Sequence, residues 1–78
     1  MDTVDPTDQS LARTLRRLRH ERGSTQEDLA HTAGLTVGAL ARIERGQANP
    51  SWTTVKRILC ALEINLVELA GEVENATV

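Results

Sequence analysis

Residues 26–45 read QEDLAHTAGLTVGALARIER, and this stretch decides how the chain folds. Its fifth residue, Ala30, is small enough for two helices to cross closely, and its ninth, Gly34, accepts the positive φ of a tight turn. Five apolar residues recur at the spacing that fixes such a helix pair to a core: Leu29, Ala33, Leu35, Leu40 and Ile43. The stretch therefore predicts two short helices joined by a tight turn, which is a helix-turn-helix.

Helices are also expected on both sides of this motif. A helix over about residues 8–22 would carry Leu11, Leu15 and Leu18 on one stripe and end at Gly23. No stretch alternates apolar and polar residues for long enough to predict a strand.

Polar residues mark the starts of the other helices. Thr25 and Thr36 are expected to cap the two helices of the motif, and Ser51 caps a fourth helix after the break at residues 47–50. Asn65 and Glu68 form a capping-box pattern that opens a short fifth helix.

The length of 78 residues and 8.5 kDa leaves room for one domain. We expect an all-α domain of five helices over residues 8–74, with a flexible acidic lead at 1–7 and a frayed end at 75–78. The chain starts at Met1 and has neither a secretory signal nor a membrane-length apolar run. It is therefore expected to be a complete cytoplasmic protein.

Composition excludes several functions. With one aromatic residue, Trp52, the chain cannot stack a row of bases as single-strand-binding sheets do. One cysteine, Cys60, rules out a disulfide framework and a cysteine-based zinc site, so this thiol is expected to be structural rather than a redox sensor. His20 and His31 are not accompanied by other metal-ligating residues at a suitable spacing, and no metal, cofactor or small-molecule ligand is expected.

The charge is unevenly distributed, although the net charge is only −2. All nine basic residues lie between positions 13 and 57, where four acidic residues leave a net +5 over residues 13–62. The first twelve residues carry −3 and residues 63–78 carry −4. This pattern fits a basic face on a compact body, and it equally fits ordinary solvated helix surfaces.

Three segments resemble the phage-repressor/Cro (XRE) group of helix-turn-helix DNA-binding proteins: TQEDLA at 25–30, IERG at 43–46 and NPS at 49–51. The resemblance extends over roughly residues 11–70. It implies a five-helix, lambda-repressor-like domain that binds operator DNA, usually as a homodimer. It also implies that the helix expected at 36–45 enters the major groove.

The exposed side of that helix would then read bases through Val37, Gly38, Ala41 and Arg42. Arg42 suits a bidentate contact to guanine, the alternative being a solvated arginine paired with an acid. Val37 suits a thymine methyl group, and Gly38 allows close backbone approach. The first three positions are often polar in the family, so discrimination here is expected to rest on few direct contacts and on DNA shape.

Phosphate contacts are expected from helix starts and from the loop after the motif, at Gln26, Thr36, Arg45, Asn49 and Ser51. Gln26 matches the family's phosphate-binding glutamine. For Gln26 and Asn49 the alternative is local capping or turn chemistry.

Other residues are assigned to structure. The resemblance implies a partly buried ion pair between Arg19 and Glu44. The remaining arginines of the first helix lie on its outer face, with Arg22 placed to reach a phosphate. Trp52 is expected to anchor the core, an interface role being the alternative. Glu63 replaces a helix-ending glycine of the family, so its turn should be mildly strained.

The leading functional hypothesis is a sequence-specific transcriptional regulator that binds a palindromic operator as a homodimer, of repressor or restriction–modification controller type. Because so small a core is marginal alone, Leu66, Leu69 and Val73 are candidate interface residues. The alternative is a protein-interaction module or antitoxin that uses the same fold without reading bases. An enzyme is excluded, because the chain lacks a nucleophile–base pair, a metal cluster and a phosphate-binding glycine loop.

Overall fold

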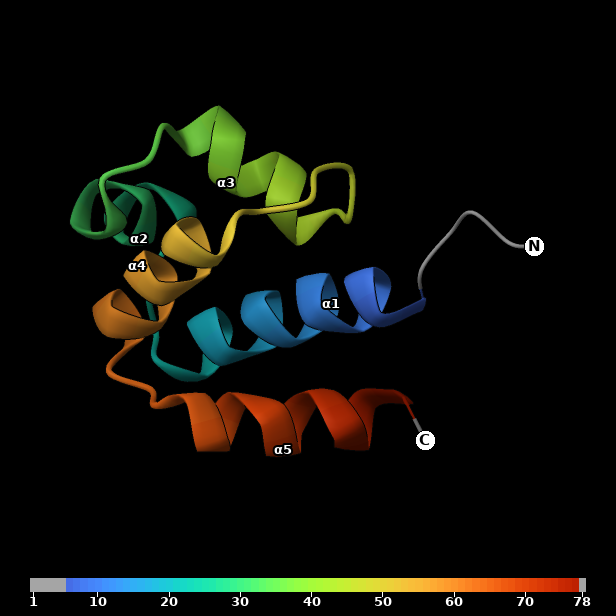
Figure 1. Ribbon diagram of the computed structural model, residues 1–78. Coiled ribbons are helices and arrows are strands. Elements are labelled where there is room, and N and C mark those ends of the chain that lie inside the picture. The colour runs from blue at the N-terminus through green and yellow to red at the C-terminus, as the bar shows by residue number, and fades with distance from the viewer. Residues whose placement is uncertain (1–5, 78) are drawn as a thin grey trace.

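The computed structural model describes the backbone of residues 6–77 and the side chains of residues 9–74. Residues 1–5 of the expected acidic lead, and Val78, lie outside the described residues. Within that part the fold contains no strand and five helices, as expected from the sequence: α1 (Pro6–Glu21), α2 (Gln26–Ala33), α3 (Val37–Glu44), α4 (Trp52–Leu62) and α5 (Leu66–Thr77). Figure 1 shows α1 in the middle, with α5 along one side and the α2–α3 pair on the other.

Two helix ends differ from the expectation. Helix α1 begins at Pro6 rather than near residue 8, because a proline in the first helical turn gives up an N–H that has no helical partner there. Helix α5 continues to Thr77, so its backbone is helical over residues 75–77, which were expected to lie in the frayed end. No proline or capping glycine interrupts this segment, and α5 packs along α1 (Figure 1).

The expected caps are present. Side-chain oxygens of Thr25, Thr36 and Ser51 each accept the backbone N–H three residues later, at 3.0–3.1 Å. Asn65 and Glu68 exchange two reciprocal bonds, of 2.8 and 3.3 Å, which is the capping box. These local bonds explain where α2, α3, α4 and α5 begin.

Two turns need a left-handed backbone. Gly34, at φ 74°, joins α2 to α3 as the motif requires. Glu63 ends α4 at φ 58°, the only non-glycine residue with a positive φ in the described chain. A side chain in this conformation costs about 1 kcal/mol, so the strained turn expected at Glu63 is confirmed.

Apolar side chains from every helix meet in one core, centred on the fully buried Leu15, Leu29, Leu40 and Ile58. None of the helices in the described chain combines the length and the apolar character needed to cross a bilayer.

Two expectations about apolar residues are wrong. Trp52 does not anchor the core: its side chain is 54% exposed and lies beside the Lys56 ammonium group, 5.9 Å from the ring centroid. Trp52 is the first residue of α4, one turn before Val55, where burial of that helix begins. Leu69 is only 5% exposed, because α5 packs it into the core of its own chain, so it is not available to a second copy.

Candidate nucleic-acid interface

Helix α3 has a buried side and an open side. Leu40 and Ile43 are buried, whereas Val37, Gly38 and Arg42 are exposed and Ala41 is half-buried. In Figure 1 this helix lies at the upper rim of the molecule, after the turn that follows α2. The residues expected to read bases therefore share the outer side of one short helix.

The open side of α3 is chemically simple. The Arg42 guanidinium forms no hydrogen bond or ion pair with another residue that the structure describes, so the alternative of pairing with an acid is not seen there. A Cβ added at Gly38 would meet no atom within 4 Å, so the backbone at this point faces open space. An unpaired guanidinium beside an accessible backbone suits close approach to base edges.

Glu44, on the inner side of α3, forms the ion pair with Arg19 that the resemblance implied. The guanidinium contacts the carboxylate through two bonds, Nε–Oε2 at 2.8 Å and Nη2–Oε1 at 2.9 Å. Both residues are buried, at 7% and 2% exposure, so the pair is more deeply buried than expected. Hydrogen bonding by Glu44 raises the pKa of the Arg19 guanidinium above its ordinary value, and burial opposes this effect.

Gln26 joins this buried pair. Its Nε2 donates to Oε1 of Glu44 at 3.0 Å, while Arg19 also donates from Nη1 to the carbonyl of Ser24 at 3.0 Å. Three segments, the end of α1, the start of α2 and the end of α3, therefore share one carboxylate. The sequence did not predict the Gln26–Glu44 bond, because a spacing of eighteen residues gives no local signal for it.

The remaining candidate phosphate-binding residues differ in whether their side chains still have a free hydrogen-bond donor. The Thr36 hydroxyl accepts the cap bond, which leaves its own hydrogen free to donate, whereas Ser51 donates to Thr54 Oγ1 at 3.0 Å. Arg45 and Asn49 are exposed, and Arg45 Nε donates to Gln47 at 3.2 Å. Side-chain contact with DNA is therefore easier for Thr36 and Arg45 than for Ser51.

Arg22 is placed differently from the expectation. Its Nε donates to the carbonyl of Leu62 at 2.9 Å, which ties the end of α1 to the end of α4. This bond holds its side chain at the last carbonyls of α4, where it stabilises a helix end.

An apolar patch, defined here as Trp52, Leu66 and Val67, lies apart from α3. These three account for all but one of the large apolar side chains that are exposed in the described chain, the other being Val37. Trp52 and Leu66 border a hollow of about 360 Å³ between α4 and the start of α5, and Val67 is 82% exposed. The signal in the sequence was Val67 itself, an apolar residue outside the buried stripe of α5.

Comparison with known proteins follows this geometry. Residues 10–70 match the family model described as a helix-turn-helix domain. The chain is 38% identical over 64 residues to the HTH-type transcriptional regulator DdrOP3 of Deinococcus deserti, covering 82% of this chain and 50% of that protein. It is 36% identical over 63 residues to the immunity repressor protein of Bacillus phage phi105, covering 81% and 44%. The chain thus spans about half the length of these two relatives.

Two solved structures of restriction-modification controller proteins align with this chain over most of its length. The restriction-modification controller protein C.AhdI from Aeromonas hydrophila aligns with a TM-score of 0.79 and 34% identity, over 83% of this chain and 98% of that one. The wild-type controller protein C.Esp1396I aligns with a TM-score of 0.90 at 24% identity, over 95% and 97%, a likeness that shows the fold alone.

Proposed function

Because this chain belongs to the family of helix-turn-helix domains, we propose that it is a transcriptional regulator that binds double-stranded DNA and has no catalytic role. It acts in the cytoplasm as a repressor or a controller of an operon. Helix α3 enters the major groove, Arg42 contacts a guanine, and Val37, Gly38 and Ala41 lie against neighbouring base edges.

The open side of α3 is the observation that carries this proposal. Val37, Gly38 and Arg42 are exposed on that side, and Ala41 is half-buried. The guanidinium group of Arg42 has no partner in the described chain. An exposed guanidinium without a partner in the described chain is free to form a bidentate contact with a guanine. The names of the two relatives, a transcriptional regulator and an immunity repressor, support the same function.

Phosphates are held on both sides of the groove. Gln26 and the free N–H groups at the start of α2 contact one strand, and Thr36, Arg45 and Asn49 contact the backbone beside α3. Ser51 contributes through the backbone at the start of α4, since its hydroxyl is used within the cap.

The regulator binds a palindromic operator as a homodimer through the apolar patch. Leu66 stays in the interface expected from the sequence, and Trp52 and Val67 replace Leu69, while the half-buried Val73 packs against the core of its own chain. Trp52 and Leu66 border one hollow, Val67 follows Leu66 in α5, and exposed large apolar side chains are typical of such contacts. A symmetric pair would place two copies of α3 on half-sites about one duplex turn apart.

Binding to a labelled duplex, measured by fluorescence anisotropy, tests this function. We expect affinity to fall steeply between about 50 and 200 mM salt, because bound phosphates release counterions. Selection from random duplexes should then yield a palindrome. A chain that binds no duplex at either salt concentration would instead support the protein-interaction module or antitoxin.

A further inference from the structure

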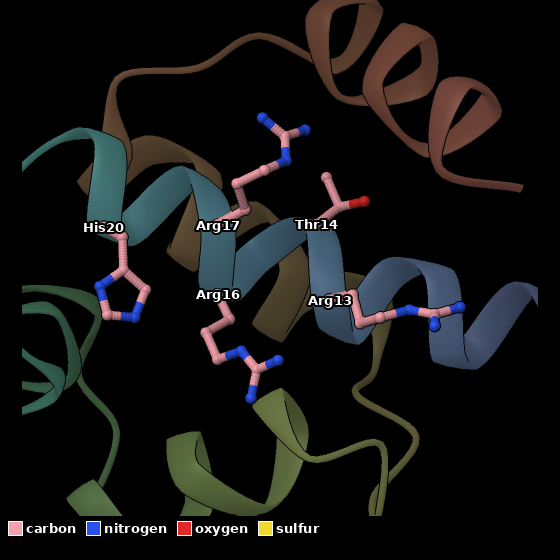
Figure 2. Close-up of a pocket in the computed structure, with 5 residues that line it drawn as sticks. All are labelled: Arg13, Thr14, Arg16, Arg17 and His20. Atoms are coloured by element: carbon pink, nitrogen blue, oxygen red, sulfur yellow. The ribbon is translucent and has the colours of Figure 1, made fainter.

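The outer side of α1 carries positive charge that the proposed DNA contacts do not use. Arg13, Arg16, Arg17 and His20 follow one another at helical spacing and, with Thr14, line a hollow of about 550 Å³ (Figure 2). We call this surface the basic furrow. Its side chains all come from one helix, so its shape depends little on how the other helices pack.

Only part of this charge is neutralised. Arg17 donates to Glu21 at 2.7 Å and also contacts Glu72 of α5, so its guanidinium is shared between two carboxylates. The guanidinium groups of Arg13 and Arg16 have no hydrogen bond or ion pair to another residue in the described chain. Two unpaired guanidinium groups one helical turn apart repel each other, and an anion placed between them would remove that repulsion.

The hydroxyl of Thr14 does not take part in such a contact. Thr14 is 1% exposed and lies on the α5 side of α1 (Figure 2), and its Oγ1 has no hydrogen-bond partner among the described residues. The exposed guanidinium groups of Arg13 and Arg16 are the donors, and guanidinium groups are suited to phosphate oxygens.

The furrow lies close to the proposed DNA-binding helix. Figure 2 shows Arg16 and His20 on the side of α1 that faces α2 and α3, with Arg17 and Thr14 on the side of α5. Helix α1 packs against α3, and Gln9 near its start contacts the Gly46 carbonyl at 3.4 Å. Arg42 and Arg45, near the end of α3, are exposed as well, so α1 and α3 both present positive charge to solvent.

We propose that the basic furrow holds DNA-backbone phosphates beyond those contacted by α2, α3 and the following loop. This inference rests on the proposed function, because it adds a second contact surface for the same duplex. The furrow is open and its arginines are exposed, which suits a continuous polyanion better than a small enclosed ligand. Its contacts would add affinity and carry no sequence information.

Charge-removing variants test the furrow. Arg13→Gln, Arg16→Gln and the double variant are compared with Arg57→Gln, which removes the same charge from an exposed position on α4. Affinity for a random duplex of about two turns is measured by anisotropy over a salt series. Each furrow substitution should lower the slope of log K against log salt by about 0.9, the double variant by about twice that, and Arg57→Gln should leave it unchanged.

The possible results separate the two proposals. A slope in the double variant equal to that of the unaltered chain overturns the furrow while leaving the proposed function intact. Absence of duplex binding by the unaltered chain overturns both. Calorimetric binding of inorganic pyrophosphate that the double variant loses, together with an unchanged DNA slope, would assign the furrow to free phosphate and overturn the DNA contact. Thermal melting of each variant by circular dichroism checks that the fold is retained.

Discussion

Arg42 and Gln26 are assigned different tasks, and single substitutions should separate them. Arg42→Ala removes the proposed guanine contact and should cost about 1–3 kcal/mol on the selected operator, with little loss on random duplexes. Gln26→Ala removes a phosphate contact and should weaken binding to both duplexes alike. Anisotropy titrations with the two duplexes measure this difference.

The two variants serve as controls for each other, since each lacks one proposed DNA contact. Equal losses for Arg42→Ala on operator and random duplexes would refute base reading by Arg42. A loss for Gln26→Ala that is confined to the operator would refute its assignment to phosphate.

Glu44 should be far more important for stability than an exposed carboxylate. Glu44→Ala leaves Arg19 buried without its partner and should lower the free energy of unfolding by about 3–5 kcal/mol. The control Glu21→Ala breaks an exposed contact with Arg17 and should cost less than about 0.5 kcal/mol. Urea unfolding followed by circular dichroism measures both, and equal losses would contradict the structural role of Glu44.

At the residue scale the sequence predicted types of contact better than the partners themselves. The Arg19–Glu44 pair followed from the resemblance, but the bond from Gln26 to the same carboxylate depends on how three helix ends converge. Trp52 was misassigned because size and apolarity favour burial, whereas its place at the start of α4 exposes it.

At the scale of the elements, local chemistry set most boundaries. Thr25, Thr36 and Ser51 cap the helices as predicted, because each side chain satisfies a backbone N–H within three residues. The start of α1 was missed because Pro6 fits the first turn of a helix, and the end of α5 was missed because no proline or capping glycine stops it before Thr77. The burial of Leu69 was missed for a different reason. Packing between distant segments decides which side of α5 faces α1, and the sequence gives no local signal for it.

Substitution of Gly38 by alanine should change the stability of the fold and the affinity for the operator in opposite directions. Gly38→Ala should raise the free energy of unfolding by about 0.5–1 kcal/mol, because alanine favours the helix and its Cβ meets no atom within 4 Å. The same methyl group should weaken operator binding, since it occupies the space through which the backbone approaches the groove. Urea unfolding and anisotropy provide the two measurements.

Gly71→Ala is the matched control, because Gly71 lies in α5 with equally open space around it. It should give a similar gain in stability and leave operator binding unchanged. If Gly38→Ala binds the operator as tightly as the unaltered chain, α3 does not approach DNA at this position.

At the scale of the whole molecule, two surfaces lie outside the helix-turn-helix, the apolar patch and the basic furrow. Val67→Lys places a charge in the patch and should shift the chain from dimer to monomer in analytical ultracentrifugation. Val67 is 82% exposed, so the change should alter the stability of the monomer by less than about 0.5 kcal/mol. His31→Lys, at an exposed position on α2, should leave the dimer unchanged.

A monomer at all concentrations of the unaltered chain would contradict the homodimer. The sequence predicted the need for a partner from the small core, but of the residues now proposed for the interface it predicted only Leu66. Trp52 and Leu66 lie fourteen residues apart and border the same hollow because the chain turns at Glu63, after which α5 packs along α1.

The most direct measurement is a nuclear magnetic resonance titration of the ¹⁵N-labelled chain with its selected duplex. We expect the largest amide shift changes at residues 37–42 and at the start of α2, where base and backbone contacts are proposed. Changes confined to α4 and α5, with residues 37–42 unaffected, would show that α3 does not enter the groove.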